Sequence, residues 1–319
     1  MRASGPLLIL LLSAAPLAGQ SLPLHRPLNP IASGRSALAA QPYVAWSPFG
    51  ARLAVSVEYG NAIEYERSPD STGTWLLDAE LMRTAVTWTR DLSPAAFVSV
   101  SGEVVGTYAG FADGFFTWYH GLINFVQPER EARPRNTFGG ELVIPGGPSL
   151  SLRRRSLALG EVRATIGLRH GLAQQTAVTL ALPTAAPRGE LGRGAPGVGV
   201  VHTMRLEPLQ QVTFEGTLGL GLTPRQGALA DYQRVLAVSG STGLRIRLWG
   251  GQSVYGYFFY HSPYYERTRL PSLDAEELTG DFGWIMRDRQ GREWRIGFSE
   301  DLAPGDAGID LILKVGRTF

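Results

Sequence analysis

The sequence predicts an all-β membrane protein: an antiparallel transmembrane β-barrel of about 12 strands, with about 14 as the alternative, and one amphipathic helix at 111–126. Apolar and polar residues alternate with a period of two in many segments, the pattern of a strand with one apolar and one polar face. Short and long connections alternate between these segments. After the N-terminal region, no run reaches the roughly 18 apolar residues of a membrane helix, so strands are left to cross the bilayer.

The N-terminal end has the features of a secretory signal peptide, expected to be cleaved and to occupy residues 1–20. Arg2 precedes an apolar run at 7–12, and small residues follow it. This predicts export through the inner membrane. Residues 21–49, rich in proline and small residues, are predicted to be an irregular lead before a single barrel domain at 50–319.

The clearest strand is 212–222, where Val212, Phe214 and Leu218 alternate with Thr213, Glu215 and Thr217. Similar alternation recurs at 53–59, 98–104, 162–169, 178–182, 244–248, 278–286 and 294–299. Charged residues on the second face require water or a polar lumen. The predicted lumen charges are Glu58, Glu103, Arg163, Arg169, Arg205, Glu215, Arg245, Arg247, Glu277 and Asp281. They either set the selectivity of a pore or pair with one another and close it.

The connections predict the strand count. Short turns are expected near 91–96, 171–173, 208–210, 250–251 and 289–291, and longer loops at 61–72, 107–156, 184–197, 224–233, 262–275 and 301–307. Short periplasmic turns and long external loops are typical of outer-membrane barrels, and they give about twelve strands. Two strands within 73–90 and another at 138–144 would give about fourteen.

Aromatic residues gather towards the strand ends, as in the interfacial girdles of membrane barrels. They include Trp88, Tyr108, Trp249, Tyr255, Tyr257, Tyr260, Tyr264 and Tyr265. The last strand alternates up to Phe319, an ending that resembles the C-terminal signature of Gram-negative outer-membrane barrels. That resemblance implies an outer-membrane location and recognition of Phe319 by the barrel-assembly machinery.

The insertion at 110–136 breaks the period of two. Phe111, Phe115, Trp118 and Leu122 recur at spacings of three and four, which predicts an amphipathic helix, and Asp113 could cap it. Its predicted position is the lumen mouth or the outer interface.

The motif Gly110–Phe115, followed by Trp118, His120 and Arg133–Asn136, resembles an uncharacterised family of Gram-negative outer-membrane β-barrel proteins with a domain of unknown function. Leu77–Glu80 resembles the acidic strand segment of that family. The resemblance implies a barrel and a location, and it implies no reaction.

The predicted function is a channel or binding protein for a small molecule, an apolar one among the candidates, with the helix as plug or gate. The ligand or gate residues would be Phe111, Asp113, Phe115, Trp118, His120, Arg133, Arg135 and Asn136. One alternative is a lipid- or peptidoglycan-related hydrolase using His120 with Asp78, Glu80 or Asp113. The other is a purely structural barrel. The non-enzymatic interpretations are preferred, because no serine stands out as a nucleophile.

Composition restricts the partners. The chain has no cysteine and its histidines show no ligand spacing, so no metal site and no cofactor are predicted. A net charge of +2 gives no basis for binding nucleic acid. Outer-membrane lipids are the expected partners, including the phosphates of lipopolysaccharide at Arg153, Arg154 and Arg155.

Overall fold

The computed structural model describes residues 24–319 except 40, 48–49, 123–132, 153–154, 185–194, 291, 303–308 and 310; the expected signal peptide lies outside these residues. The strands are β1 (Ala51–Arg67), β2 (Thr74–Ser93), β3 (Ala96–Tyr108), β4 (Gly139–Val143), β5 (Ser149–Ser151), β6 (Arg155–Arg169), β7 (Gln174–Leu182), β8 (Gly197–Leu209), β9 (Val212–Leu222), β10 (Leu236–Arg247), β11 (Gln252–His261), β12 (Glu277–Arg287), β13 (Glu293–Asp301) and β14 (Leu311–Thr318). The helices are α1 (Pro30–Ser33), α2 (Asp113–Leu122), α4 (Pro271–Asp274) and the short 3-10 helix η1 (Ala230–Tyr232). None of the helices within the described residues is long and apolar enough to cross a membrane.

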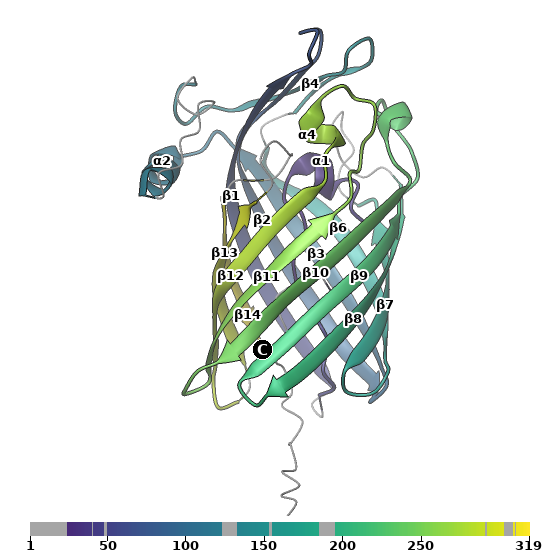
Figure 1. The fold of residues 1–319 in the computed structure, drawn as a ribbon, viewed down its shortest axis with the longest axis vertical. Coiled ribbons are helices and arrows are strands. Elements are labelled where there is room, and N and C mark those ends of the chain that lie inside the picture. Colours follow the sequence, from purple (N-terminus) through teal and green to yellow (C-terminus); the bar gives the residue numbers. More distant parts are fainter. Residues whose placement is uncertain are drawn as a thin grey trace, which may run out of the picture.

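The strands form one antiparallel sheet that closes on itself (Figure 1). β1 pairs with β14 on one side and with β2 on the other, which completes the ring. β4 pairs with the outer end of β2, and β5 pairs with β4 alone. These two strands lie outside the ring, so 12 of the 14 strands in the sheet form the barrel. The predicted twelve-stranded barrel is therefore confirmed. The fourteen-stranded alternative required a strand at 138–144 and two strands within 73–90. Residues 138–144 do contain a strand, β4, but it lies outside the ring. Residues 74–90 belong to the single strand β2.

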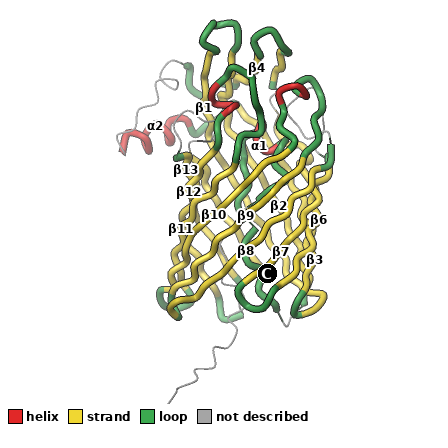
Figure 2. Tube along the Cα trace, turned by 45° about the vertical axis from the view of Figure 1, so that its right-hand side comes forward, coloured by secondary structure: helices red, strands yellow, loops and turns green. Residues whose placement is uncertain are grey.

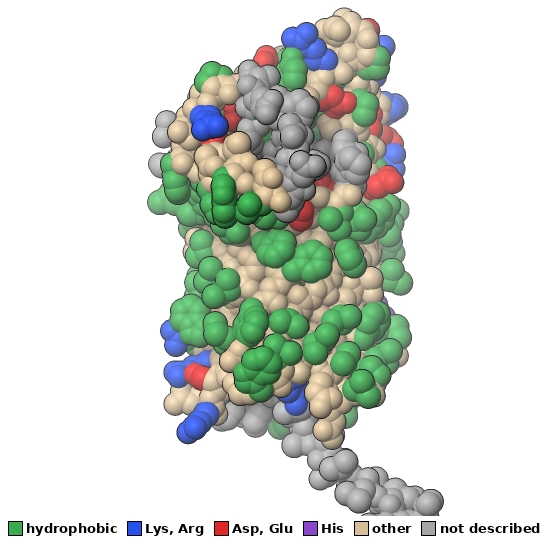
Figure 3. Space-filling view, turned by 60° about the vertical axis from the view of Figure 1, so that its left-hand side comes forward, with side chains coloured by type: hydrophobic (Ala, Val, Ile, Leu, Met, Phe, Trp, Pro, Cys, Tyr) green, Lys and Arg blue, Asp and Glu red, His purple; other side chains and the backbone are tan. Residues whose placement is uncertain are grey.

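Side chains alternate between the two faces of the wall. On β9, Leu218 and Leu220 are exposed on the outside, whereas Thr213, Glu215 and Thr217 are buried inside. The same alternation on the other strands produces a belt of hydrophobic side chains around the barrel, with charged side chains concentrated at its two ends (Figure 3). This outer surface suits the hydrocarbon core of a bilayer.

β1 and β2 are much longer than a bilayer requires. They have 17 and 20 residues, whereas about 9–11 residues of a tilted strand span the hydrocarbon core. The loop expected at 61–72 is therefore wrong over residues 61–67, which continue β1. Together with the β4–β5 pair, these strand ends rise above the ring, as Figures 1 and 2 show.

An apolar cluster closes the outer end of the barrel, and we refer to it as the dome. It joins residues of α1, the inner faces of β2 and β4, and the outer loops. Its largest fully buried members are Trp75, Leu38, Leu77, Leu142, Ile144 and Leu270. Tyr264 and Tyr265 were predicted from the sequence to be girdle residues, but they belong to the dome. Tyr255 and Tyr257 face the lumen, because Tyr255 lies opposite the buried Arg245.

Candidate functional site

Residues 24–39 and 41–47 pass through the interior of the barrel, and we call the stretch 24–47 the lumenal segment (Figure 1). At its outer end is α1, whose first turn is capped by the Asn29 side chain, which accepts a hydrogen bond of 3.0 Å from the Ile31 N–H. The Asn29 amide donates to Glu64 of β1 at 3.0 Å. The segment therefore turns beneath the dome and returns along the opposite part of the wall.

The first half of the segment is held by charges of the wall. Arg26 donates to Glu103 at 2.7 Å, and both side chains are nearly inaccessible to solvent. Arg83 of β2 donates to the carbonyls of Arg26 and Pro27 at 2.8 and 2.9 Å, and to Glu58 at 2.6 Å. These wall residues bind the backbone of the segment as well as each other.

The second half has no regular secondary structure, so its backbone needs other hydrogen-bond partners. The wall supplies them: Gln175 donates to the Pro42 carbonyl at 2.7 Å, and Thr203 donates to the Gln41 carbonyl at 2.8 Å. Near α1, Arg35 of the segment donates to carbonyls at the outer ends of the wall. The described backbone of the segment is thus matched to polar groups on the inner face.

A glycine groove receives the Leu38 side chain of the second half. Leu38 is fully buried against β8 and β9, opposite Gly199, Gly219 and Gly221. A Cβ at Gly221 would lie 2.8 Å from Leu38 Cγ, and a Cβ at Gly199 would lie 2.5 Å from the Ala37 carbonyl oxygen. Side chains at these positions would collide with the segment. The wall is therefore shaped around it.

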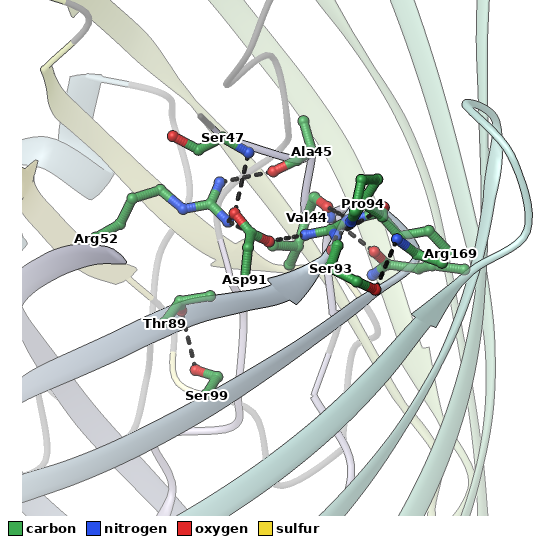
Figure 4. A network of polar contacts seen from close by, with 12 residues as sticks. Val44, Ala45, Ser47, Arg52, Thr89, Asp91, Ser93, Pro94, Ser99 and Arg169 are labelled. Atoms are coloured by element: carbon green, nitrogen blue, oxygen red, sulfur yellow. Dashed lines mark hydrogen bonds and ion pairs between the residues drawn. The ribbon is translucent and has the colours of Figure 1, made fainter. Parts of the chain in front are cut away.

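A clamp at the end of the barrel opposite the dome holds the end of the segment (Figure 4). Asp91 forms ion pairs with Arg52 and Arg169 and accepts the Ser47 N–H at 3.0 Å. Arg169 also donates to the Val44 carbonyl at 2.6 Å, and Arg52 donates to the carbonyl of residue 45 at 2.8 Å.

Replacing Asp91 by alanine is expected to destabilise the barrel by about 3–5 kcal/mol, because it leaves two largely buried arginines without their carboxylate. Urea unfolding in lipid vesicles measures this loss. Asp288→Ala removes an exposed carboxylate paired with Arg292 and is expected to change the unfolding midpoint little. Equal effects of the two variants would contradict the clamp.

A cavity of about 230 Å³ remains between the lumenal segment and the wall. Its lining is mixed: charged side chains such as Arg26, Glu58 and Arg83 lie among apolar side chains such as Val55 and Val201. A small chamber with several charged side chains therefore lies beside the described part of the segment.

The structure places the predicted lumen charges on the inner face. Eight of the ten are buried, the Glu103 side chain is nearly inaccessible, and Arg247 is half-buried. Ion pairs join Arg83 to Glu58, Arg26 to Glu103, Arg163 to Glu161, Arg169 to Asp91, Arg205 to Glu207, Arg245 to Glu293 and Lys314 to Asp281. His261 forms a hydrogen bond of 2.9 Å with Glu277. Glu215 accepts the Tyr43 N–H at 3.2 Å. In this arrangement the charges bind one another and the segment.

The insertion forms a second polar site, on the outside of the wall. Glu58 and Arg83 face the lumen, so Asn61 and Glu80, each three residues away, face outward. Glu80 accepts the N–H groups of Phe111 and Ala112 at 2.9 and 2.6 Å and the hydroxyl of Tyr59.

Two further carboxylates complete this site. Asp113 accepts the Asn61 amide at 2.9 Å and the Asn136 N–H at 2.5 Å, and Arg133 donates to Asp78 at 2.5 Å. We call Asn61, Asp78, Glu80, Asp113, Arg133 and Asn136 the outer-rim cluster. It brings together the three motifs that carried the family resemblance.

The helix predicted at 111–126 is described as α2 over Asp113–Leu122; residues 123–126 lie outside the described part of the chain. Figures 1 and 2 show it beside the outer wall and not inside the lumen. Tyr119 reaches Glu300 of β13 at 3.5 Å. Burial raises the pKa of the Tyr119 phenol and the Glu300 carboxylate raises it further, so the phenol stays protonated and donates.

The hydrolase interpretation required His120 to meet a carboxylate. Its side chain lies outside the described part of the structure, and Asp78, Glu80 and Asp113 are all bonded to other groups.

The other predicted site residues lie on the surface of the insertion. Phe111, Phe115 and Trp118 are exposed on α2 and the turn before it, and Arg135 is exposed near the end of the insertion. Among the described residues, no group of histidine and acidic side chains could hold a metal ion. Arg153, Arg154 and the Arg155 side chain also lie outside the described residues.

Sequence reasoning missed the lumenal segment as the main occupant of the lumen. One signal was available: Gly199, Gly219 and Gly221 fall on the inward phase of two adjacent strands, where they leave space for another part of the protein.

No family model matches the chain, and no curated protein matches it. Among solved structures it is similar to the NanC porin (7% identity, TM-score 0.46, 84% of this chain and 98% of that one). It is also similar to the translocator domain of the autotransporter NalP from Neisseria meningitidis (10%, 0.44, 92% and 92%). A third is the toluene transporter TodX from Pseudomonas putida (8%, 0.40, 85% and 89%). The likeness is to barrels of different function, and it assigns none to this chain.

Proposed function

We propose that the chain is an outer-membrane channel for a small molecule, held closed by its own lumenal segment. The observation that carries this proposal is the seating of Leu38 in the glycine groove, together with the backbone hydrogen bonds around it. A wall that served only as an anchor would have no need of inward glycines opposite a separate stretch of chain. Passage requires the segment to leave its groove.

The chemical class of the solute is inferred from the two regions that it would pass in the lumen, the dome and the chamber. The dome is apolar, whereas the chamber beneath it combines apolar side chains with several arginines. An apolar molecule could be admitted through the dome loops, and a hydrophilic one could be retained in the chamber. The proposed solute is therefore a small molecule of either class, and the same sites would serve a protein that binds it without transport.

The outer-membrane location and the family resemblance belong to the same proposal. The apolar belt supports insertion in a bilayer, and the convergence of Leu77–Glu80, Gly110–Phe115 and Arg133–Asn136 on one buried cluster supports a shared structural motif. We place the plug in the lumenal segment rather than in α2, because α2 lies outside the wall. Recognition of Phe319 by the assembly machinery and binding of lipopolysaccharide at Arg153–Arg155 are further proposals.

A reversible cross-link tests the gate. The chain contains no cysteine, so Leu38→Cys with Gly221→Cys introduces a single pair. A sulfur near the present position of Leu38 Cγ would lie about 2.8 Å from the new Cβ at position 221, close to the separation across a disulfide. The oxidised double variant is expected to remain silent in planar bilayers, and reduction is expected to restore channel openings.

Each single cysteine variant is the control, since it cannot form the bond. Equal conductance before and after reduction would contradict gating by the segment. If unlocked protein and a variant lacking residues 24–47 are both silent and exclude all solutes from vesicles, the barrel is structural.

A further inference from the structure

We propose that α2 is a membrane-interface helix, whose exposed aromatic face is inserted into the outer leaflet beside the barrel. This inference is independent of the gate, because it concerns the outer surface. It assigns to the insertion a partner, the boundary between lipid headgroups and acyl chains.

The first argument is the distribution of side chains on the helix. Phe115, Trp118 and Leu122 are 45%, 58% and 65% exposed, and their spacings of three and four place them on one face. Phe111, just before the helix, is 79% exposed and in the same phase. Phe116, on another face, is 1% exposed. An exposed stripe of large apolar residues indicates a surface that is covered in the membrane-bound protein.

The second argument is the height of the helix on the barrel. On β1 the lipid-facing residues Leu53 and Val57 are followed by Tyr59, and then by the buried polar Asn61. The Phe111 ring lies 5.7 Å from the Tyr59 ring, so the helix begins where the apolar belt ends. Aromatic rings favour this level of a bilayer. The stripe on α2 therefore continues the surface that already faces lipid.

The third argument is orientation. The start of α2 is tied to β1 through Asn61 and Asp113, and Tyr119 contacts Glu300 of β13, two strands further round the barrel. The helix thus lies around the wall rather than along it, as Figure 2 also shows. A helix in this orientation lies in the membrane plane, the arrangement of interfacial amphipathic helices.

The outer-rim cluster explains how the helix is kept there. Glu80 binds the two N–H groups before α2, and Asp113 connects its first turn to both β1 and Asn136. Gly110 has a φ of +86°, and a Cβ there would lie 2.7 Å from Glu80 Oε1, so glycine permits this close approach. Asn136 also adopts a left-handed conformation, with a φ of +58°.

Single-cysteine variants test the position of the helix in the otherwise cysteine-free chain. Trp118→Cys and Leu122→Cys would each carry an environment-sensitive NBD label in phosphatidylcholine vesicles. Leu218→Cys, on the lipid-facing belt, is the membrane reference, and Ser149→Cys, exposed on β5, is the aqueous reference. Both α2 labels are expected to be blue-shifted relative to position 149 and to be quenched by doxyl groups on the acyl chains, as at position 218.

Two outcomes would overturn the proposal. Labels on α2 that behave as at position 149, together with unlabelled cysteines on α2 that react as fast as Ser149→Cys with a membrane-impermeant thiol reagent, would place the helix in water. Labels that are blue-shifted but not quenched by the labelled lipids would show that protein, such as a second copy of the chain, covers this face.

Discussion

Gly221→Leu is expected to raise the open probability of the proposed channel by about 5–150-fold. The new side chain would occupy the space of Leu38, and overpacking of this kind costs about 1–3 kcal/mol, which here acts against the seated state of the segment. In the proposed gate, this strain is relieved when the segment leaves its groove. Single-channel recording in planar bilayers gives the open probability directly.

Gly216→Leu is the matched control for this variant. It lies on the same strand but on the lipid side, where an added Cβ would come no closer to another group than 3.6 Å, to the Ser241 carbonyl oxygen. Its open probability should equal that of the unmodified protein. Similar increases for both variants would point to a general weakening of β9, and no increase at position 221 would remove the glycine groove from the gating mechanism.

Glu80→Ala is expected to detach the insertion from the wall. The change leaves the N–H groups of Phe111 and Ala112 and the Tyr59 hydroxyl without their acceptor, at about 1–3 kcal/mol for each buried group left unsatisfied. The local stability of residues 110–136 should fall far more than that of the barrel. Limited proteolysis followed by mass spectrometry would detect faster cleavage within this segment.

Glu141→Ala provides a comparison, because Glu141 is an exposed carboxylate on the neighbouring strand β4. Glu80→Gln retains one carbonyl acceptor and should give an intermediate rate of cleavage. If the alanine variants at 80 and 141 are cleaved equally slowly, the outer-rim cluster does not hold the helix in place.

The barrel itself could be predicted because its pattern is local. Leu218 and Leu220 alternate with Thr217 and Gly219 along one strand, and such a pattern requires two different environments whatever the rest of the chain does. The same reasoning identified the inward charges. It was wrong at residues 61–67, which continue β1 because they pair with residues 74–80 of β2 instead of forming a loop.

The position of the aromatic residues was harder to predict. Tyr255 and Tyr257 read as girdle residues near a strand end, yet they are buried inside the barrel, with Tyr257 6.2 Å from the ring of His25. Their phase on β11 distinguishes inside from outside only once the register with Arg245 is known. That register depends on pairing between strands, which no single segment contains.

The amino-acid sequence by itself therefore determined a twelve-stranded barrel, its polar inner face and the presence of a helix in the insertion, since each depends on periodicity within one segment. Only the tertiary structure decided what fills the lumen and on which side of the wall the helix lies. The contacts that settle these points, such as Arg26 with Glu103 and Arg35 with the Thr223 carbonyl, join residues 77 and 188 positions apart. Contacts between such distant residues produce no periodic pattern in the sequence, because the residues meet only after the ring has closed.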